Sequence, residues 1–397
     1  MADNVAGAPG VLRAINDRAA LTLLMKHGTL SRAQMVELTG LSKPTAAELL
    51  SRLIADGLVV LSGTTSGARG PSAQLYSINR DLAYVAGVNA EEDRVTAAIA
   101  DLTGHVIGEA SVEVDLTAGG TPVPAVRQAV RNASRKARTA MKSLRHIVIG
   151  VTGSYDPTTD RVIYASHLPG WEEPGVMKQL RDGFGVPVTV QNDANLAAVG
   201  ERTRGGAKDV DTFALLWVAR GLGLAVELGG RLYQGARGGA GEVGYILMGG
   251  RSATFQDSVG NSAVLQLARR HGLKGDSADD VVAAAVRDAE TKLPFLQELA
   301  ERLATGIATI VAVLDPPLIV LAGSTCQAGG SLLLELTRTE LARISPFSTP
   351  LVASSVTGSP VLAGAVDTAV ALGRESVFGG LSSEAWAPMA PSERLLA

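Results

Sequence analysis

The spacing of apolar residues changes near residue 80, and no other feature of the chain constrains its fold as strongly. Before that point, apolar residues recur three and four positions apart, which is typical of amphipathic helices. After it, short apolar runs such as residues 84–88 and 95–100 end at Gly or Asp and alternate with helical segments, a pattern that predicts α/β layers. We therefore expect a small, largely helical N-terminal domain over residues 1–80, followed by a larger α/β body.

Length, charge and cysteine content limit the class of protein. The 397 residues are enough for two or three domains, each with its own core. Residues 1–80 carry eight Lys or Arg and five Asp or Glu, whereas the whole chain has a formal charge of −3, so the front is mildly basic and the body acidic. Cys326 is the only cysteine, which excludes an intramolecular disulfide and fits a reducing cytoplasm. The sequence has neither a secretory leader nor a long apolar run, so we expect a cytoplasmic protein without a membrane anchor.

The first 28 residues predict one amphipathic helix. Its apolar residues Leu12, Ile15, Ala19 and Leu23 recur at helical spacing and so share one face. We expect that face to pack into the core of the domain. Gly28 marks the end of the helix.

Capping signals predict two more helices directly after it. Ser31 and Gln34 have the spacing of a capping box, which predicts a short helix from residue 32 to about residue 38. Gly40 supplies the positive φ of a tight turn, and Ser42 opens a third helix in whose first turn Pro44 is tolerated. Two short helices joined in this way are typical of a helix-turn-helix. The apolar positions available for its core are Met35, Leu41, Ala46, Leu49, Leu50 and Leu53.

The candidate DNA-contacting residues lie at the start of the third helix and in a loop after it. In a helix-turn-helix, the N-terminal residues of the second helix meet base edges and phosphates in the major groove; Ser42, Lys43 and Thr45 occupy these positions, and Arg32 begins the preceding helix. Predicted strands over residues 58–61 and 74–78 complete a winged helix. Arg69, at the tip of the wing, would enter the minor groove or grip a phosphate. The alternatives are a solvated loop arginine and a helix-turn-helix that serves protein contacts.

The α/β body carries four short motifs in a fixed order: residues 149–154 (Ile-Gly-Val-Thr-Gly-Ser), 168–171 (Leu-Pro-Gly-Trp), 192–195 (Asn-Asp-Ala-Asn) and 241–244 (Gly-Glu-Val-Gly). Together with the winged helix, this order resembles the ROK family, which joins repressors to sugar kinases, and in particular its NagC- and XylR-like regulators. The resemblance covers roughly residues 10–375. It implies an actin-like (ribonuclease H-like) two-lobed ATPase-type fold behind the winged helix-turn-helix.

The resemblance also implies how the body is divided. An effector domain over residues 81–378 would consist of a first lobe of about residues 81–190 plus the last helix, and a second lobe of about residues 191–360. Residues 379–397 would form a loose tail.

A sugar site in the cleft between the lobes is implied as well. Asp193 resembles the catalytic aspartate of the family, which accepts the proton of the sugar hydroxyl; in a regulator it would simply hold that hydroxyl. The other candidate sugar contacts are Gly153, His167, Asn192, Glu242, Tyr245 and Gln256. Structural alternatives stay open: a strand-end cap for Asp193, a turn or capping role for Asn192 and Glu242, and a surface loop position for His167.

Both phosphate-binding loops of the ATP-using members are altered. Their first loop has an Asp followed shortly by Gly-Gly-Thr, whereas here Asn89 replaces the Asp, and Glu91 and Glu92 replace the glycines. Carboxylates at these positions would repel a polyphosphate. In the second loop Arg220 replaces a hydroxyl residue, although an arginine still attracts anions. We therefore expect no nucleotide cofactor and no phosphoryl transfer.

The zinc site of the family is not expected either. That site uses a His after Gly-Glu-x-Gly and three cysteines shortly downstream, because a tetrahedral site needs four such ligands. Here Tyr245 takes the place of the His, and no cysteine follows before Cys326. The sequence therefore predicts no metal.

These observations predict a sequence-specific DNA-binding regulator, in the simplest case a repressor of carbohydrate uptake or catabolism genes. It would bind a palindromic operator in double-stranded DNA as a homodimer or homotetramer and respond to a sugar or sugar derivative in the cleft. One alternative is a sugar kinase with an accessory DNA-binding domain, which ATP turnover would reveal. The other is a regulator whose pocket is vestigial or serves as an interaction surface, which stabilisation by a sugar would argue against.

Overall fold

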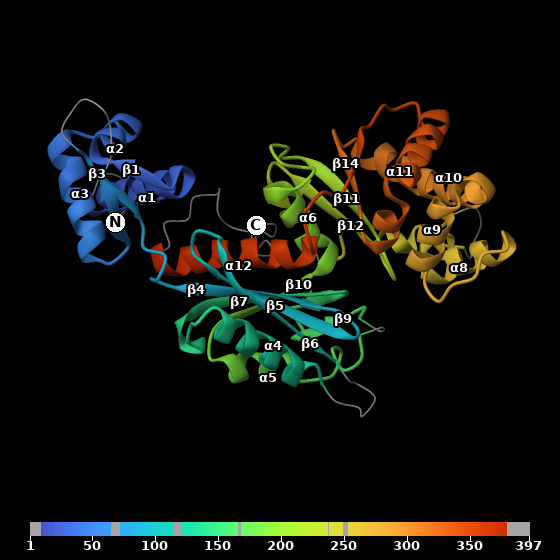
Figure 1. Cartoon of the computed structure of the whole chain (residues 1–397), viewed down its shortest axis with the longest axis horizontal. Coiled ribbons are helices and arrows are strands. Elements are labelled where there is room, and N and C mark those ends of the chain that lie inside the picture. The colour runs from blue at the N-terminus through green and yellow to red at the C-terminus, as the bar shows by residue number, and fades with distance from the viewer. Residues whose placement is uncertain are drawn as a thin grey trace, which may run out of the picture.

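The computed structural model describes residues 9–64, 72–114, 121–165, 168–236, 238–248 and 253–378. A winged helix lies at one end of the molecule, and two α/β units with one large sheet each follow it (Figure 1). This arrangement confirms the predicted α/β architecture behind a winged helix-turn-helix. Within the described ranges, no helix is both long and apolar enough to cross a membrane.

The winged helix has three helices and a three-stranded antiparallel sheet in the order β1-β3-β2. Its elements are α1 (Pro9–His27), β1 (Thr29–Ser31), α2 (Arg32–Thr39), α3 (Lys43–Ala55), β2 (Val59–Thr64) and β3 (Gln74–Ile78). The capping box of Ser31 and Gln34 is present, Gly40 has a φ of 70°, and Ser42 caps α3, as the sequence predicts. The short strand β1 was not predicted, because three residues between two helices carry too little pattern.

The predicted apolar face of α1 is only partly right, because Leu23 alone of its four residues packs against the core of the domain. Leu12 and Ile15 are 55% and 51% exposed, and Ala19 is exposed as well. Instead, the neighbouring face of α1 enters the core through Ala20, Leu21 and Leu24. Among the described residues, the packing partners of α1 lie along its C-terminal half, and those partners, rather than the helical spacing, decide which face is buried. The predicted core positions of α2 and α3 are buried, apart from Leu41, which is partly exposed.

The first α/β unit is built on a five-stranded sheet in the order β10-β7-β4-β5-β6. Helices α4 (Val123–Lys136) and α5 (Val176–Phe184) cover one face, and α12 (Pro360–Phe378), the last described helix, returns to cover the other (Figure 1). A small hairpin, β8–β9, follows β7. The strands are β4 (Tyr84–Ala90), β5 (Arg94–Asp101), β6 (Val106–Glu113), β7 (Leu144–Val151), β8 (Ser154–Asp156), β9 (Arg161–Ile163) and β10 (Val188–Asn192).

The second unit has a five-stranded sheet in the order β13-β12-β11-β14-β15. Helix α6 (Asp193–Arg204) lies on one face, and helices α7 to α11 pack on the other, where they form the largest apolar cluster. The strands are β11 (Phe213–Val218), β12 (Leu222–Leu228), β13 (Arg231–Leu232), β14 (Ile319–Ala322) and β15 (Leu351–Ala353). The helices are α7 (Gln256–Val259), α8 (Asn261–Arg270), α9 (Ala278–Arg287), α10 (Ala289–Leu314) and α11 (Ser324–Ile344).

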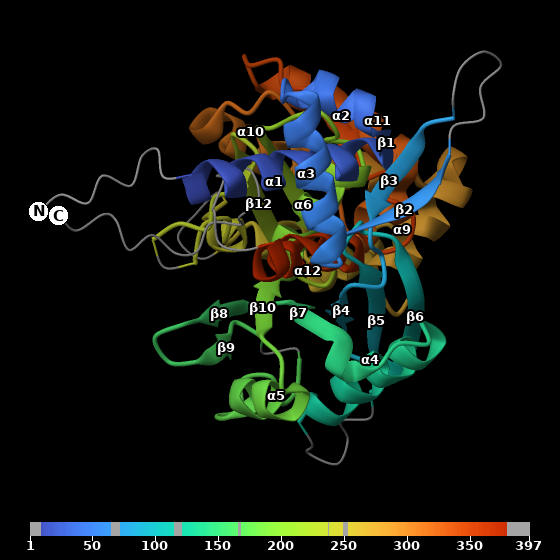
Figure 2. The same ribbon diagram turned by 90° about the vertical axis from the view of Figure 1, so that its left-hand side faces the viewer.

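Helices α6 and α12 pack closely and connect the three units. A Cβ on Gly364 of α12 would lie 1.8 Å from the carbonyl oxygen of Leu196, and a Cβ on Gly200 of α6 would lie 2.6 Å from that of Pro360, so only glycine allows this approach. At the far end of α12, Phe378 packs against the core of the winged helix. Figure 2, which views the molecule from the winged-helix end, shows α3 in front and α12 behind it. One helix therefore runs from the centre of the α/β body to the winged helix.

Candidate functional site

Two adjoining cavities separate the sheets of the two α/β units. One has a volume of about 450 Å³ and is lined by most of the residues for which a sugar contact was predicted. The other, of about 670 Å³, lies toward the altered phosphate loops. Both cavities share a boundary formed by Thr152, Asp193, Trp217, Arg220 and Gly221. We call the smaller one the polar cavity and the larger one the loop cavity.

Asp193 lies at the floor of the polar cavity. It is the first residue of α6, directly after strand β10, and is only 8% exposed. Thr152 Oγ1 donates a hydrogen bond of 2.8 Å to one carboxylate oxygen, and the backbone N–H of Ala194 donates one of 2.8 Å to the other. Burial raises the pKa of Asp193 to about 6, even though these two hydrogen bonds oppose the shift. With a pKa near 6, the group is mostly ionised at pH 7 and can accept a hydrogen bond from a ligand hydroxyl.

Asn192 combines a structural role with a place in the cavity. Its side-chain oxygen accepts a hydrogen bond of 3.1 Å from the N–H of Asn195, so it caps α6, and its amide donates one of 3.0 Å to the carbonyl of Gly153. The capping alternative for Asn192 is therefore present. Gly153 itself has a φ of 140°, and a Cβ there would meet the carbonyl oxygen of Ile163 at 2.8 Å. These contacts lock the loop after β7 against the start of α6.

Glu242, Gln256 and Tyr245 line the polar cavity from the second unit. No hydrogen bond joins the carboxylate of Glu242 to another described residue, and it does not cap the 3-10 helix Val243–Tyr245 that follows it. Burial raises its pKa. Gln256 donates a hydrogen bond of 3.4 Å to the carbonyl of Arg220, and Tyr245 is 67% exposed. The cavity thus brings together five of the seven candidate sugar contacts as side chains, together with the backbone of Gly153, while His167 lies outside the described residues.

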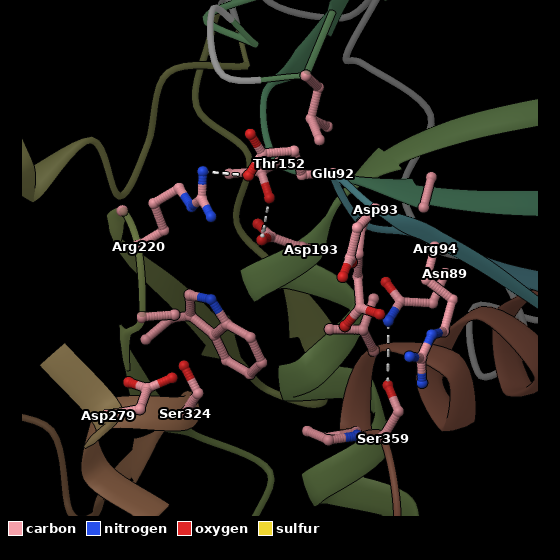
Figure 3. A pocket seen from close by; sticks show the side chains of 18 of the residues that line it. Asn89, Glu92, Asp93, Arg94, Thr152, Asp193, Arg220, Asp279, Ser324 and Ser359 are labelled. Carbon is pink, nitrogen blue, oxygen red and sulfur yellow. Dashed lines mark hydrogen bonds and ion pairs between the residues drawn. The ribbon is translucent and has the colours of Figure 1, made fainter. Parts of the chain in front are cut away.

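An ion pair spans the cleft where the two altered phosphate loops face each other. The guanidinium of Arg220, in the turn between β11 and β12, contacts the carboxylate of Glu92, in the turn between β4 and β5. Figure 3 shows Arg220 reaching across the pocket toward Glu92, beside the hydrogen bond between Thr152 and Asp193. The side chains are 60% and 43% exposed. The single cation introduced into the second loop is therefore already neutralised by an acid introduced into the first.

The other first-loop substitutions also change the loop cavity. Asn89 is 6% exposed and donates a hydrogen bond of 3.4 Å to Ser359, at the start of α12. Burial, and then the charge of Asp93, raise the pKa of Glu91, whereas Arg94 and Asn89 oppose the shift. Glu91, Glu92 and Asp93 all line the loop cavity, which makes this side of the cleft acidic.

The residues of the family's zinc site do not fit a metal here. Tyr245 offers a phenol in place of an imidazole. The thiol of Cys326 packs beside the core of the second unit on α11, and burial raises its pKa to about 12, so it does not supply the thiolate that zinc requires.

The candidate DNA-contacting residues gather at the start of α3. Ser42, Lys43 and Thr45 are all exposed, and no acidic residue lies in the first turn of the helix. The Ser42 hydroxyl accepts a hydrogen bond from the N–H of Thr45 and also contacts the Thr45 hydroxyl at 2.8 Å, so both hydroxyls take part in the cap. Arg32 is exposed at the start of α2. Arg69 lies outside the described residues.

Several cavity residues were missed from the sequence. Thr152 lies within a quoted motif, next to Gly153, but only the fold brings its hydroxyl to Asp193. Trp217 and Tyr164 also line the polar cavity. Trp217 lies in an apolar strand that looks like ordinary core, and Tyr164 lies in a segment without a clear pattern, so neither carried a signal of its own.

Comparison with known proteins places this arrangement in a family. Residues 13–60 match the model of a winged helix-turn-helix DNA-binding family. A putative xylose repressor from Caldicellulosiruptor sp. (strain Rt8B.4) is 24% identical over 357 residues, which cover 84% of this chain and 88% of the repressor. A crystal structure of a ROK family transcriptional regulator, a homologue of the E. coli MLC protein, shares the fold with a TM-score of 0.70 at 20% identity, over 92% of this chain and 97% of that one.

The α/β body alone is similar to sugar kinases. The crystal structure of a ROK family glucokinase from Streptomyces griseus, in complex with glucose and AMPPNP, has a TM-score of 0.60 at 24% identity and covers 72% of this chain and 98% of that one. The model of the ROK family matches residues 85–371, which is most of the chain. The predicted resemblance is thereby confirmed: the chain belongs to the ROK family.

Proposed function

We propose that the chain is a sugar-responsive, DNA-binding transcription repressor that does not use ATP. A winged-helix domain over residues 1–80 would bind a palindromic operator in the cytoplasm as part of a homodimer or homotetramer. An effector domain over residues 81–378 would bind a sugar or sugar derivative in the polar cavity. Residues 379–397, for which a tail was predicted, lie outside the described residues. The genes controlled would serve carbohydrate uptake or catabolism, in line with the xylose repressors among the relatives.

The ion pair between Glu92 and Arg220 carries the proposal. In the ATP-using members of the family, the two loops that correspond to these positions hold the phosphates of the nucleotide. Here the guanidinium of Arg220 and the carboxylate of Glu92 lie between the two loops and form an ion pair. A nucleotide would have to break the pair and approach Glu91 and Asp93 as well. The cleft therefore retains polar groups for a sugar and lacks a cradle for a polyphosphate.

The polar cavity supports a sugar as the effector. Its floor offers Asp193 and Thr152, and its wall offers Glu242 and Gln256. Clustered donors and acceptors of this kind suit the hydroxyl groups of a carbohydrate. Because Glu242 has no hydrogen-bond partner among the described residues, a ligand hydroxyl would satisfy a partly buried carboxylate.

The start of α3 supports DNA binding. The positive dipole end of the helix favours a phosphate, and the exposed Lys43 adds a full charge beside it. Thr45 and Ser42 are short side chains that allow the helix to approach base edges closely.

Helix α12 offers a mechanical link between the two sites. Asp193 begins α6, α6 packs through glycines against α12, and Phe378 at the end of α12 contacts the winged helix. A sugar that changes the lobe arrangement would in this way change the position of the winged helix, and DNA affinity with it.

Operator binding with and without sugars tests the proposal. Promoter fragments from the source genome are footprinted with the purified chain, and the affinity for a protected fragment is then measured by fluorescence anisotropy in the presence of a panel of monosaccharides. We expect a protected, two-fold symmetric site and at least one sugar that changes the affinity. Lys43→Ala serves as the control for specific docking. Absence of any protected fragment would refute the proposal.

A sugar kinase with an accessory DNA-binding domain is the competing function, because glucokinases share the fold of the body. Incubation of the chain with ATP, Mg²⁺ and the same sugars separates the two functions. Sugar-dependent ADP release would favour the kinase. A sugar that raises the melting temperature without ADP release favours the regulator and also argues against a vestigial pocket.

A further inference from the structure

Aromatic side chains gather at the polar cavity although they are scarce in the chain. Phe, Trp and Tyr make up 4% of the residues, yet Tyr164, Trp217 and Tyr245 all line this one cavity. Trp217 lies on the boundary with the loop cavity. Tyr164 and Tyr245 come from different units of the fold, at the end of the β8–β9 hairpin and in the 3-10 helix after Glu242.

Tyr164 adopts an unfavourable backbone conformation at the cavity. Its φ is 61°, in the left-handed region that bulky side chains rarely occupy. Its side chain is 56% exposed, and no hydrogen bond joins its hydroxyl to another described residue. Neither burial nor hydrogen bonding therefore compensates for the conformation. Strained residues of this kind concentrate where a side chain must be presented to a ligand.

Tyr245 presents a second ring to the same cavity. It is 67% exposed, and its hydroxyl also has no partner among the described residues. The chain exposes other tyrosines: Tyr233 is 55% exposed but does not line the polar cavity. Tyr164 and Tyr245 thus differ from Tyr233 in lining one cavity, each from a different unit of the fold.

The exposure of the lining residues distinguishes a buried floor of the cavity from an exposed mouth. Asp193, at 8% exposed, lies at the floor, whereas the two tyrosines, each more than half exposed, lie at the mouth. A sugar whose hydroxyl reaches Asp193 is surrounded by the polar groups of the floor and wall. Only the part of a ligand that protrudes toward the mouth can cover the two rings. Aromatic rings of this kind present an electron-rich face, which suits the C–H groups of a second sugar ring or the edge of an aryl group.

We propose that Tyr164 and Tyr245 form a second subsite at the mouth of the polar cavity, and that the effector is a glycoside: a disaccharide or an aryl glycoside. Its first sugar ring occupies the floor beside Asp193, and its second ring, sugar or aromatic, lies against the two tyrosines. This inference rests on the proposed function, because it extends the same effector site. It also gives the strained conformation of Tyr164 a purpose, which is to hold one ring at the mouth before the ligand arrives.

Calorimetric titration of the full chain tests the subsite. Glucose and xylose are compared with maltose, cellobiose, xylobiose and the 4-nitrophenyl glycosides of both sugars. We expect at least one glycoside to bind about three- to tenfold more tightly than its own monosaccharide, the range expected for one added aromatic contact. Trp217 lies in the same cavity, so its fluorescence offers a second readout of the same titrations.

Ring-removing variants assign the gain to the tyrosines. Tyr164→Gly, which also relieves the backbone conformation, should abolish most of the glycoside advantage and leave monosaccharide affinity unchanged. Tyr245→Ala should weaken glycosides more than monosaccharides, because the ring it removes also belongs to the candidate sugar contacts. Tyr164→Phe and Tyr245→Phe should retain the advantage, and Tyr233→Ala is the matched control. Melting curves identify a variant that fails to fold. In that case, removal of the other tyrosine ring still tests the subsite, and the phenylalanine variants serve as folded controls.

The possible failures differ from one another. If monosaccharides bind as tightly as every glycoside, or if the variants weaken both classes equally, the second subsite is refuted and the proposed effector site stands. If neither sugars nor glycosides bind, both proposals are refuted together.

Discussion

Helices α3 and α6 begin in the same way and lie in opposite surroundings. Ser42 caps α3 and Asn192 caps α6, and in both cases the cap accepts a hydrogen bond from the N–H three residues on. The next residue differs. Lys43 follows the cap of α3 and points its cation into solvent, whereas Asp193 follows the cap of α6 and is buried at the floor of a cavity.

This difference determines what each helix start can bind. Both helices have a positive dipole end at their first turn. At α3 no acid competes for that positive end, so a phosphate of DNA can occupy it. At α6 the carboxylate of Asp193 already occupies it and would repel a phosphate, but it suits the hydroxyl of a neutral sugar. One local motif is thus compatible with two ligands of different charge because of one residue.

The largest expected effect concerns the cation of α3. Lys43→Glu should weaken operator binding about 100-fold or more, because it replaces a phosphate contact by repulsion in each copy of a dimer. Fluorescence anisotropy at several salt concentrations measures the change. Lys43→Ala should lower the salt slope by about one per copy.

Lys142→Glu makes the same charge change in the α/β body and serves as the control. If Lys43→Glu and Lys142→Glu weaken binding equally, the effect reflects net charge alone, and α3 is not the helix that enters the major groove.

The second prediction concerns the buried acid of α6. Burial raises the pKa of Asp193 from 3.8 to about 6, so between these values the folded chain holds a proton that the unfolded chain releases. Stability therefore falls as the pH rises through this window, and ionised Asp193 costs about 3 kcal/mol, as an order of magnitude, above it. Asp193→Asn removes this cost. Urea unfolding from pH 4 to pH 7.5 should show the variant gaining stability relative to the wild type up to about pH 6.5 and by a constant amount above it.

The same variant should bind its sugar at least about tenfold more weakly at neutral pH, because a charged hydrogen-bond partner is lost. Glu48→Gln, which neutralises an exposed acid of α3, is the matched control and should alter neither property. A stability difference that does not vary with pH would mean that Asp193 is not the group that titrates.

The starts of both helices could be predicted from the sequence because capping is local. Ser31, Gln34 and Ser42 act on backbone groups three residues away, so the sequence contains both partners of each interaction. The buried face of α1 could not be predicted in the same way. Leu12 and Ile15 have the right spacing, but burial depends on how α2, α3 and β3 pack against the helix, which the spacing within α1 does not determine.

In the candidate site, too, the individual residues could be predicted from the sequence, whereas a contact between distant residues could not. The motifs predicted that Asp193, Glu242 and Gln256 would be relevant, and the fold brings them to one cavity. Each of Glu92 and Arg220 was recognised from the sequence as a change that disfavours a nucleotide. That they pair with each other could not be seen, because 128 positions separate them and the contact depends on how the two sheets face each other.

The third prediction compares the two caps directly. Ser42→Ala should destabilise the winged helix by about 1 kcal/mol, the usual cost of losing an N-cap, and Ser42→Gly by only a few tenths. Asn192→Ala should cost about 2 kcal/mol, because it removes both the cap of α6 and the hydrogen bond to Gly153. Thermal unfolding followed by circular dichroism measures both. Equal costs would mean that the contact with Gly153 contributes nothing to stability.

The smallest expected effect concerns the ion pair across the cleft, where the cation is neutralised by a partner, unlike Lys43. Both side chains are substantially exposed, so the pair should contribute only about 0.2–1 kcal/mol. A double-mutant cycle of Glu92→Arg, Arg220→Glu and the exchanged pair isolates this coupling from the charge changes themselves. The exchanged pair should recover the stability that the single variants lose at low salt, and the coupling should vanish near 1 M salt because ions screen exposed charges. Arg94→Glu, in the same cavity but without an ion pair among the described residues, should show no such recovery when combined with Glu92→Arg. A coupling that persists at high salt would mean that the pair is shielded from water. Arg220 would then contribute more to holding the two lobes together than an exposed ion pair normally does.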